Sequence, residues 1–304
     1  MSATYRSHGK LLLTGEYAVL DGAEALGLPA RFGQTLDISE GNTPGLLWKS
    51  LDHEGKTWFE TEFHPGQLDP KEKDPSGDDT RDILQGLLRE AVRLNPDFNA
   101  DLKGIRAVAQ LEFPRIWGLG SSSTLINNIA QWAGVDPYIL LWNAFGGSGY
   151  DIACARATGP LIYKVQDRVP VSEPVPFNPP FHNRLYFVHL NRKQSSREAI
   201  AMYRKNVRDH KDFLEEISGI SREMATCTNW ESFTALIEKH ETLLAGILEM
   251  ERIQDQIFPD FDGIVKSLGA WGGDFVLAGG EGDIPSYFKA KGYKTVLSYR
   301  DMVL

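Results

Sequence analysis

The sequence predicts a two-domain α+β protein with antiparallel sheets. Segments with a strand pattern and segments with a helix pattern come in separate groups, whereas a doubly wound parallel sheet would alternate them along the chain. The 304 residues are enough for two domains, at roughly 150 residues each. The proline-rich stretch 168–180 (RVPVSEPVPFNPP) is the best candidate for a junction. We therefore expect one domain over residues 1–175 and a second over 176–304.

Strand-forming residues dominate the first hundred or so positions. Residues 10–20 (KLLLTGEYAVL) are interrupted by Gly15, which predicts two short strands or a strand with a bulge. Apolar and polar residues alternate over 34–40 (QTLDISE) and 57–63 (TWFETEF), as in half-buried antiparallel strands. Residues 104–113 (GIRAVAQLEF) predict another strand, which ends at a proline.

Helical spacing of apolar residues appears at several later places. It predicts helices over 82–94, 122–132, 136–145 and after the glycine turn at 146–149, and long helices over 195–250. GPLIYKV and RLYFVHL predict strands. The segment 261–280 predicts a helix, a glycine loop and a strand, and the chain closes with a helix at 284–292 and a strand at 293–299.

Composition restricts the compartment and the partners. The formal net charge is −9, with 42% hydrophobic and 24% charged residues, so we expect a soluble folded protein that binds neither nucleic acid nor an anionic membrane. Cys154 and Cys227 lie far apart without metal-ligand spacing, which favours a reducing cytosol. The polar start (MSATYRSHGK) and the absence of an 18-residue apolar run indicate a cytoplasmic protein.

The segment Gly118–Ser123 (GLGSSS) stands where a helix is expected to begin. The first N–H groups of a helix lack intrahelical partners and carry the positive end of its dipole. Glycines let that backbone approach an anion, and serine hydroxyls add donors or a ligand for Mg²⁺. The segment matches neither a Walker A loop nor a dinucleotide fingerprint. A serine-rich helix cap without a ligand remains an equal alternative from these residues alone.

Two charged residues and a second glycine-rich segment are further candidates. Asp151, in FGGSGYDIA, either caps a helix or orients a substrate hydroxyl and accepts its proton. Lys10 is either a solvated surface group or a partner that keeps this carboxylate ionised and contacts the transferred phosphoryl group. The glycines at 269, 272 and 273 either close over a phosphate or form a plain turn.

In this order, these segments resemble the motifs of the GHMP kinases, which act on small molecules such as galactose, homoserine, mevalonate and phosphomevalonate. GKLLLTGEYAVLDG resembles the first motif, PRIWGLGSSS the ATP phosphate loop, and LGAWGGDFVLA the third motif. GGSGYDIA resembles the Ser-Gly-x-Asp of the mevalonate and phosphomevalonate branches. The resemblance extends from Lys10 to about Ala278. It implies an N-terminal domain like domain 2 of ribosomal protein S5 and a ferredoxin-like C-terminal domain.

The resemblance also implies ATP-dependent phosphoryl transfer to a small-molecule acceptor, with ATP and Mg²⁺, by a monomer or homodimer. It makes Asp151 the catalytic carboxylate, Lys10 its partner and Ser122 a Mg²⁺ ligand. The residues implied to hold the ATP phosphates are Gly118, Leu119, Gly120, Ser121, Ser122 and Ser123. The residues implied to lie at the acceptor are Glu16, Tyr17, Ser148, Lys193, Ser196, Arg197, Gly272 and Gly273. For Arg197, a solvated first helical turn is an equal alternative.

Details of the motifs slightly favour phosphomevalonate kinase over mevalonate kinase or another sugar or alcohol kinase of this group. Three positions depart from the usual pattern: His8 replaces a proline, Leu140 a Mg²⁺-binding glutamate, and Trp271 a glycine. Trp271 shapes the acceptor pocket, stacks on something planar or fills core space, and the first of these is the interpretation that we favour. Because of Leu140 and Trp271, a catalytically silent protein that binds a nucleotide or metabolite remains an alternative. A decarboxylase of mevalonate diphosphate is a further one.

Overall fold

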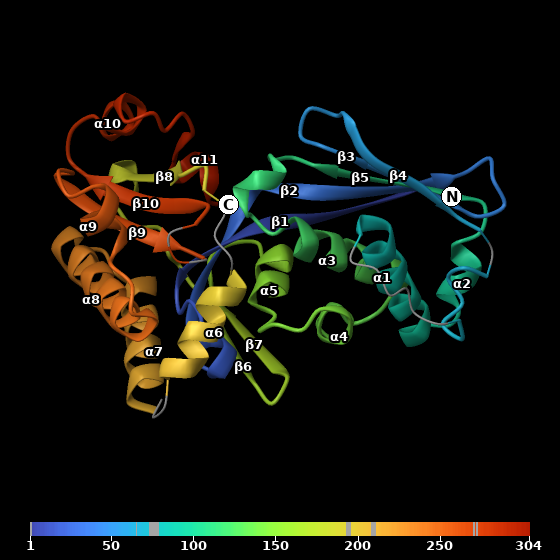
Figure 1. The fold of residues 1–304 in the computed structure, drawn as a ribbon, viewed down its shortest axis with the longest axis horizontal. Coiled ribbons are helices and arrows are strands. Elements are labelled where there is room, and N and C mark those ends of the chain that lie inside the picture. Colours follow the sequence, from blue (N-terminus) through green and yellow to red (C-terminus); the bar gives the residue numbers. More distant parts are fainter. Residues whose placement is uncertain are drawn as a thin grey trace. The chain divides into compact units, whose positions relative to one another are not determined.

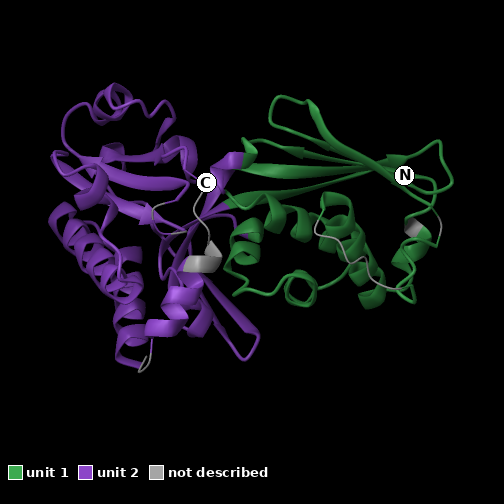
Figure 2. Ribbon diagram, in the orientation of Figure 1, with its two compact units in different colours: residues 1–9, 32–115, 119–156 green, residues 10–31, 116–118, 157–304 purple. Residues whose placement is uncertain are grey.

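The computed structural model describes residues 2–64, 66–72, 79–192, 196–207, 211–269, 271 and 273–304. Its strands and helices confirm the α+β class (Figure 1). The chain divides into two compact units, shown in Figure 2. Unit 1 takes in residues 1–9, 32–115 and 119–156, and unit 2 takes in residues 10–31, 116–118 and 157–304. The expected boundary between residues 175 and 176 lies inside unit 2.

The larger sheet has seven strands in the order β4-β3-β5-β2-β6-β7, with β1 paired to β2. Its strands are β1 (Ala3–Thr14), β2 (Ala25–Glu40), β3 (Leu46–Leu51), β4 (Thr57–Phe63), β5 (Ile105–Leu111), β6 (Leu161–Gln166) and β7 (Val169–Pro174). Strand β3 runs parallel to β5, whereas β2 pairs antiparallel with β5 in unit 1 and with β6 in unit 2.

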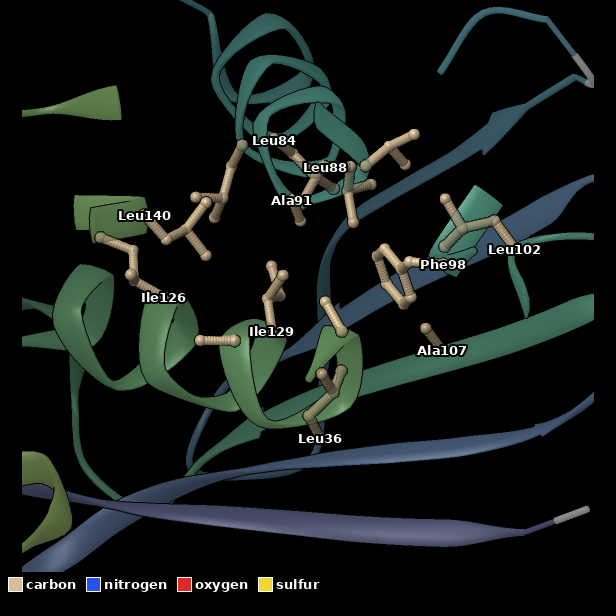
Figure 3. Packing of buried hydrophobic residues seen from close by; sticks show 14 of the residues in the cluster. Leu36, Leu84, Leu88, Ala91, Phe98, Leu102, Ala107, Ile126, Ile129 and Leu140 are labelled. Carbon is tan, nitrogen blue, oxygen red and sulfur yellow. The ribbon is translucent and has the colours of Figure 1, made fainter. Parts of the chain in front are cut away.

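Unit 1 packs helices against its part of this sheet. They are α1 (Thr80–Leu94), α2 (Phe98–Asp101), α3 (Ser121–Ala133), α4 (Pro137–Ala144) and α5 (Tyr150–Arg156), with a 3₁₀ turn, η2, at Arg115–Trp117 before α3. Figure 3 shows Leu84 and Leu88 of α1, Ile126 and Ile129 of α3, and Leu140 of α4 meeting in one core. Each such side chain contributes about 1.5–3 kcal/mol when fully buried.

Buried polar side chains fix the position of α3 on the sheet. The Asn128 amide donates to the carbonyl of Gln34 at 2.9 Å, and its oxygen accepts the Ser7 hydroxyl at 2.6 Å. The Thr124 hydroxyl donates to the Gln34 side chain at 2.8 Å. Since a buried polar group without a partner is costly, these bonds select one register for α3. They therefore fix where the helix begins.

Unit 2 contains a four-stranded antiparallel sheet in the order β11-β8-β10-β9. Its strands are β8 (Leu185–His189), β9 (Gly263–Leu268), β10 (Phe275–Gly280) and β11 (Val296–Ser298). The helices are α6 (Ser196–Asn206), α7 (Lys211–Ala225), α8 (Trp230–Leu248), α9 (Ile253–Ile257), α10 (Ile284–Ala290) and α11 (Tyr299–Met302), with 3₁₀ turns η1 (Ala18–Asp21) and η3 (His182–Arg184). None of the helices formed by the described residues has the length and apolar composition that a membrane span requires.

Three sequence-based expectations are wrong in detail. Residues 10–20 form the end of β1, a turn and η1 rather than two short strands or a strand with a bulge. The stretch expected to join two domains contains β7, which pairs antiparallel with β6. Strand β7 lies at the edge of the sheet, so one side of it has no partner strand. The prolines at 170 and 174, which lack an N–H group, interrupt no hydrogen bonds on that side. Residues 263–268 form β9 rather than a helix, because periodicity does not discriminate over so short an apolar run.

Candidate active site

The start of α3 has the backbone that an anion site requires. Gly120 is the residue before the helix and has a left-handed conformation, with φ 88° and ψ 45°. As a glycine it offers no side-chain acceptor to the first N–H groups of α3. The Ser123 hydroxyl turns inward and donates to the Gly120 carbonyl at 2.9 Å. Ser122 is exposed. The positive end of the helix therefore presents a serine hydroxyl in addition to the first backbone N–H groups of α3.

Asp151 lies in the first turn of α5 and is half-buried. The buried Ser148 hydroxyl accepts the N–H of Tyr150 at 3.4 Å. Helix α5 packs against α3 within unit 1. The structure thus brings the serine-rich helix start and Asp151 into one unit, on two helices in contact. Lys10, on β1, belongs to unit 2, and its pairing with Asp151 stays a prediction.

The segment before α3, residues 116–118, and the third motif meet within unit 2. Gly118 has φ 64°, and a Cβ added there would lie 1.8 Å from Oδ2 of Asp274. The Trp117 ring meets the ring of Phe275 edge-on, with centroids 5.6 Å apart. His189 Nε2 donates to the carbonyl of Ile116 at 3.0 Å. Residues 116–118 are therefore held against β8 and the start of β10.

The first and third motifs also meet within unit 2. The Tyr17 hydroxyl accepts the backbone N–H of Trp271 at 2.9 Å. Burial raises the pKa of this phenol to about 12, so it remains protonated at neutral pH. Trp271 is 1% exposed and packs with Tyr17, Tyr203 and Leu244. Trp271 therefore fills core space, the last of the three interpretations that its sequence position allowed rather than the favoured one.

Glu16 is buried, and its carboxylate accepts a hydrogen bond from the ammonium group of Lys266 at 2.8 Å. Lys266 was not among the sequence candidates, nor were its neighbours His240 and Glu241 on α8. The sequence feature that could have identified Lys266 is a lysine within the apolar run of β9. Because a helix was expected there, the lysine was compatible with an exposed helix face and gave no indication of a buried ion pair. Glu16 was expected at the acceptor. In the structure one of its carboxylate oxygens contacts Lys266 and the other lies 3.2 Å from His240 Nε2, both within unit 2.

Leu140 explains one departure from the family pattern. It is completely buried in the core of unit 1 (Figure 3), so its helix face could not have carried a metal ligand without losing that core contact. The nearby polar residue Asn143 donates to Glu90 of α1 at 2.9 Å. Among the described residues, no group of three or more His, Cys, Asp or Glu side chains is placed to hold a metal ion.

The remaining acceptor candidates are only partly open to comparison. Lys193 and Gly272 lie outside the described residues. Ser196 and Arg197 begin α6, and their side chains also lie outside the described part. Gly273 is buried, directly before Asp274. The acceptor side of the site thus stays a prediction from the sequence.

Comparison with protein-family models gives no match, and comparison with curated protein sequences gives none either. Solved structures do match. The mevalonate kinase of Methanococcus jannaschii matches with a TM-score of 0.69 at 18% identity, over 97% of this chain and 96% of that one. Phosphomevalonate kinase of Streptococcus pneumoniae, in complex with phosphomevalonate and AMPPNP, gives 0.67 at 19% identity, over 95% of each chain. Galactokinase of Lactococcus lactis, complexed with galactose, gives 0.65 at 14% identity, over 100% and 93%. The chain therefore has the α+β fold of the GHMP kinases.

Proposed function

We propose that this protein is an ATP-dependent kinase of a small-molecule acceptor. The observation that carries the proposal is that unit 1 contains, on two helices that pack together, a helix start without a side-chain cap at Gly120 and the carboxylate of Asp151. Such a helix start suits a polyphosphate. A carboxylate in the same unit suits an acceptor hydroxyl whose proton must leave. The fold likeness to three kinases supports the same assignment.

In this mechanism the protein positions two substrates and neutralises charge. Backbone amides over 118–123 hold the ATP phosphates, and Lys10 offsets the charge that develops on the transferred phosphoryl group. Asp151 orients the acceptor hydroxyl and takes its proton as the oxygen attacks the γ-phosphorus in line. Ser148 is proposed to lie on the acceptor side, whereas the hydroxyl of Tyr17, expected there from the sequence, accepts the backbone N–H of Trp271. Lys193, Ser196, Arg197, Gly272 and Gly273 are proposed there from the sequence alone.

The donor set fits Mg²⁺ held mainly by the nucleotide. Mg²⁺ commonly keeps several waters and takes one or two protein oxygens in addition to substrate phosphates. The exposed hydroxyl of Ser122 is the oxygen we propose, because no carboxylate cluster among the described residues competes with it. When bound, the ion would offset the negative charge of the phosphates.

Phosphomevalonate is the acceptor that we slightly favour, with mevalonate and other sugars or alcohols as alternatives. The choice predicts different roles for Asp151. An alcohol needs a base, whereas a phosphate monoester is already ionised and needs none. The substitution Asp151→Asn should therefore lower turnover about a hundredfold or more with an alcohol acceptor, and less with a phosphate acceptor.

The experiment is an ADP-release assay with ATP and Mg²⁺ against mevalonate, phosphomevalonate, galactose and homoserine. The matched control for Asp151→Asn is Asp136→Asn, because Asp136 begins α4 in the same unit and its carboxylate accepts the N–H groups of Tyr138 and Ile139 at 2.7 and 3.1 Å. Each variant replaces a carboxylate by an amide of the same shape, and because asparagine caps a helix as well as aspartate does, stability should change little in either. Loss of a catalytic base lowers turnover only in the first. Near-normal turnover of Asp151→Asn with an alcohol would reject it as the base.

One specific observation favours a second candidate, a protein that binds nucleotide without transferring phosphate. Leu140, at the position of the usual metal-binding glutamate, is part of the hydrophobic core. This candidate predicts measurable AMPPNP binding by calorimetry together with no ADP release from any of the four acceptors. Release of ADP above the ATP-only rate with any acceptor excludes it. Mevalonate diphosphate as a fifth substrate tests the remaining alternative, since CO₂ release from it would indicate a decarboxylase.

A further inference from the structure

A group of ionisable side chains lies wholly buried in unit 2, next to the first motif. Lys266 of β9 donates to Glu16 at 2.8 Å, to Glu241 of α8 at 3.0 Å and to the carbonyl of Ser267 at 2.9 Å. The second oxygen of Glu241 accepts the N–H of Ser267 at 3.1 Å. Every proton of the ammonium group thus has an acceptor, and α8, β9 and the segment after β1 are tied together.

Electrostatic stabilisation alone does not account for this arrangement. Burial by itself lowers the pKa of Lys266, and the two carboxylates outweigh burial and raise it above its usual value. Burial raises the pKa of Glu16, and Lys266 and His240 outweigh burial and lower it. Both groups are therefore charged at neutral pH. Because a buried ion pair is often no more stabilising than apolar residues of the same volume, the geometry that it enforces is the more informative property.

The segment that contains Glu16 forms a strained turn. Tyr17 has φ 61° and ψ −45°, and the N–H of Ala18 donates to the carbonyl of Glu16 at 2.7 Å. This is the γ-turn with positive φ, the rarer and more strained of the two kinds. A bulky residue with positive φ persists only where its surroundings enforce it.

The first two residues of this turn, and Gly15 directly before it, are each held by a separate contact in unit 2. The N–H of Gly15 donates to His240 Nε2 at 3.0 Å. Glu16 is held by Lys266. The Tyr17 ring stacks on Tyr203 of α6, with centroids 5.9 Å apart, and its hydroxyl accepts the N–H of Trp271. The turn therefore has the surroundings that such strain requires.

We propose that Lys266 and Tyr17 are positioning residues for the third glycine-rich motif. Lys266 fixes Glu16, the γ-turn then directs the Tyr17 hydroxyl at the backbone of Trp271, and Trp271 anchors the segment whose Asp274 lies against Gly118 of the phosphate loop. Glu16 acts inside this chain of contacts rather than on the acceptor. The catalytic consequence rests on the proposed function, but the positioning itself does not.

Hydrogen exchange at the amide of Trp271 tests the positioning directly. In Tyr17→Phe this amide loses its acceptor, and the loss of about 1 kcal/mol for one hydrogen bond corresponds to exchange about fivefold faster. The matched control is Tyr299→Phe. Tyr299 is buried in unit 2 to the same degree, and its hydroxyl likewise bonds to a backbone group, the carbonyl of Phe177, at 2.9 Å. This control should leave exchange at Trp271 unchanged.

The decisive variants do not touch Trp271 at all. Lys266→Met and Glu16→Gln act on Trp271 only through the turn, and both should accelerate exchange at its amide. Glu16→Gln is the milder change, because it retains an amide oxygen for Lys266. It serves as the test if Lys266→Met fails to fold. Exchange at Trp271 equal to the unsubstituted protein in Glu16→Gln would overturn the proposal. An equal acceleration in Tyr299→Phe would also overturn it, because it would indicate general loosening of unit 2.

Kinetics then test whether the positioning matters for transfer. With an active acceptor, Tyr17→Phe should lower kcat/KM about fivefold at a melting temperature equal to that of Tyr299→Phe. Equal kcat/KM in the two variants would overturn the catalytic part of the proposal. A protein that releases no ADP with any acceptor would defeat the proposed function, while the exchange rates would still decide the positioning role.

Discussion

The contact between Gly118 and Asp274 gives a prediction whose size follows from the structure. An alanine at 118 would keep φ near 64°, a left-handed conformation that costs an L-residue about 1–2 kcal/mol. Its Cβ would also lie 1.8 Å from Oδ2 and 2.4 Å from Cγ of Asp274, far inside the 3.4 Å of an ordinary contact. Relieving that overlap adds about 1–3 kcal/mol.

The matched control is Gly104→Ala. Gly104 has nearly the same backbone, φ 68°, but an added Cβ would come no closer than 3.9 Å to the carbonyl of Thr43. The two variants therefore share the cost of the left-handed backbone and differ in the overlap. Urea unfolding followed by tryptophan fluorescence should show Gly118→Ala less stable than Gly104→Ala by about 1–3 kcal/mol.

Activity should separate the two variants further. A displacement of about 1 Å in a substrate-positioning segment can cost about a hundredfold in rate, so ADP release should fall steeply in Gly118→Ala and little in Gly104→Ala. Combining Gly118→Ala with Asp274→Ala removes the overlapping carboxylate and should restore the overlap part of the lost stability. Equal stability of the two glycine variants, or additive effects in the double variant, would refute the close contact as the cause.

Three further substitutions or conditions test the rest of the structure. Leu140→Glu should cost several kcal/mol in unfolding free energy without improving ADP release, because it buries a carboxylate in the core, whereas Leu140→Met should cost less than about 1.5 kcal/mol. Trp271→Ala should cost about 3–5 kcal/mol as a core truncation, and a smaller loss would show that the indole is not packed as described. The stability difference between the unsubstituted protein and Glu16→Gln should be constant across neutral pH and shrink as the pH falls below about 4.5. The pKa of Glu16 is lowered on folding, so its contribution is present above its unfolded pKa and lost below its folded pKa.

Local sequence patterns sufficed for most of the fold. The strands at 57–63 and 105–111 and the helices that begin near 80, 121 and 137 were predictable from alternation, helical spacing and start signals such as Asp136-Pro137. Two of the errors share one cause. Strands β7 and β9 are short and depend on partners that the local sequence does not specify, β6 for one and β10 for the other.

The candidate site was predictable where function depends on the backbone, and less so where it depends on distant side chains. Gly120 and the serines after it indicate a helix start, and α3 begins there. Lys266 could not be identified in this way. Its partner Glu16 lies 250 positions earlier in the chain, and no spacing rule links two residues that only the tertiary fold brings together.

Two glycines of the phosphate loop illustrate why the motif alone left two interpretations open. Gly118 is required by a neighbour, because the Asp274 carboxylate occupies the space of a side chain, and that requirement would exist in a protein that binds no phosphate. Gly120 is different, since the residue before α3 has no side-chain acceptor for the first N–H groups, and the nearby Ser123 hydroxyl donates to the Gly120 carbonyl instead of accepting from an amide. A helix cap without a ligand would use the opposite arrangement, with a serine or aspartate accepting the first N–H groups. The observation that favours an anion is therefore the absence of a side-chain cap from Gly120, rather than the number of glycines and serines. Gly120→Ser adds a side-chain acceptor beside the first N–H groups, at a cost of about 1–2 kcal/mol for an L-residue at φ 88°. It should weaken AMPPNP binding measured by calorimetry, and unchanged affinity would contradict this assignment.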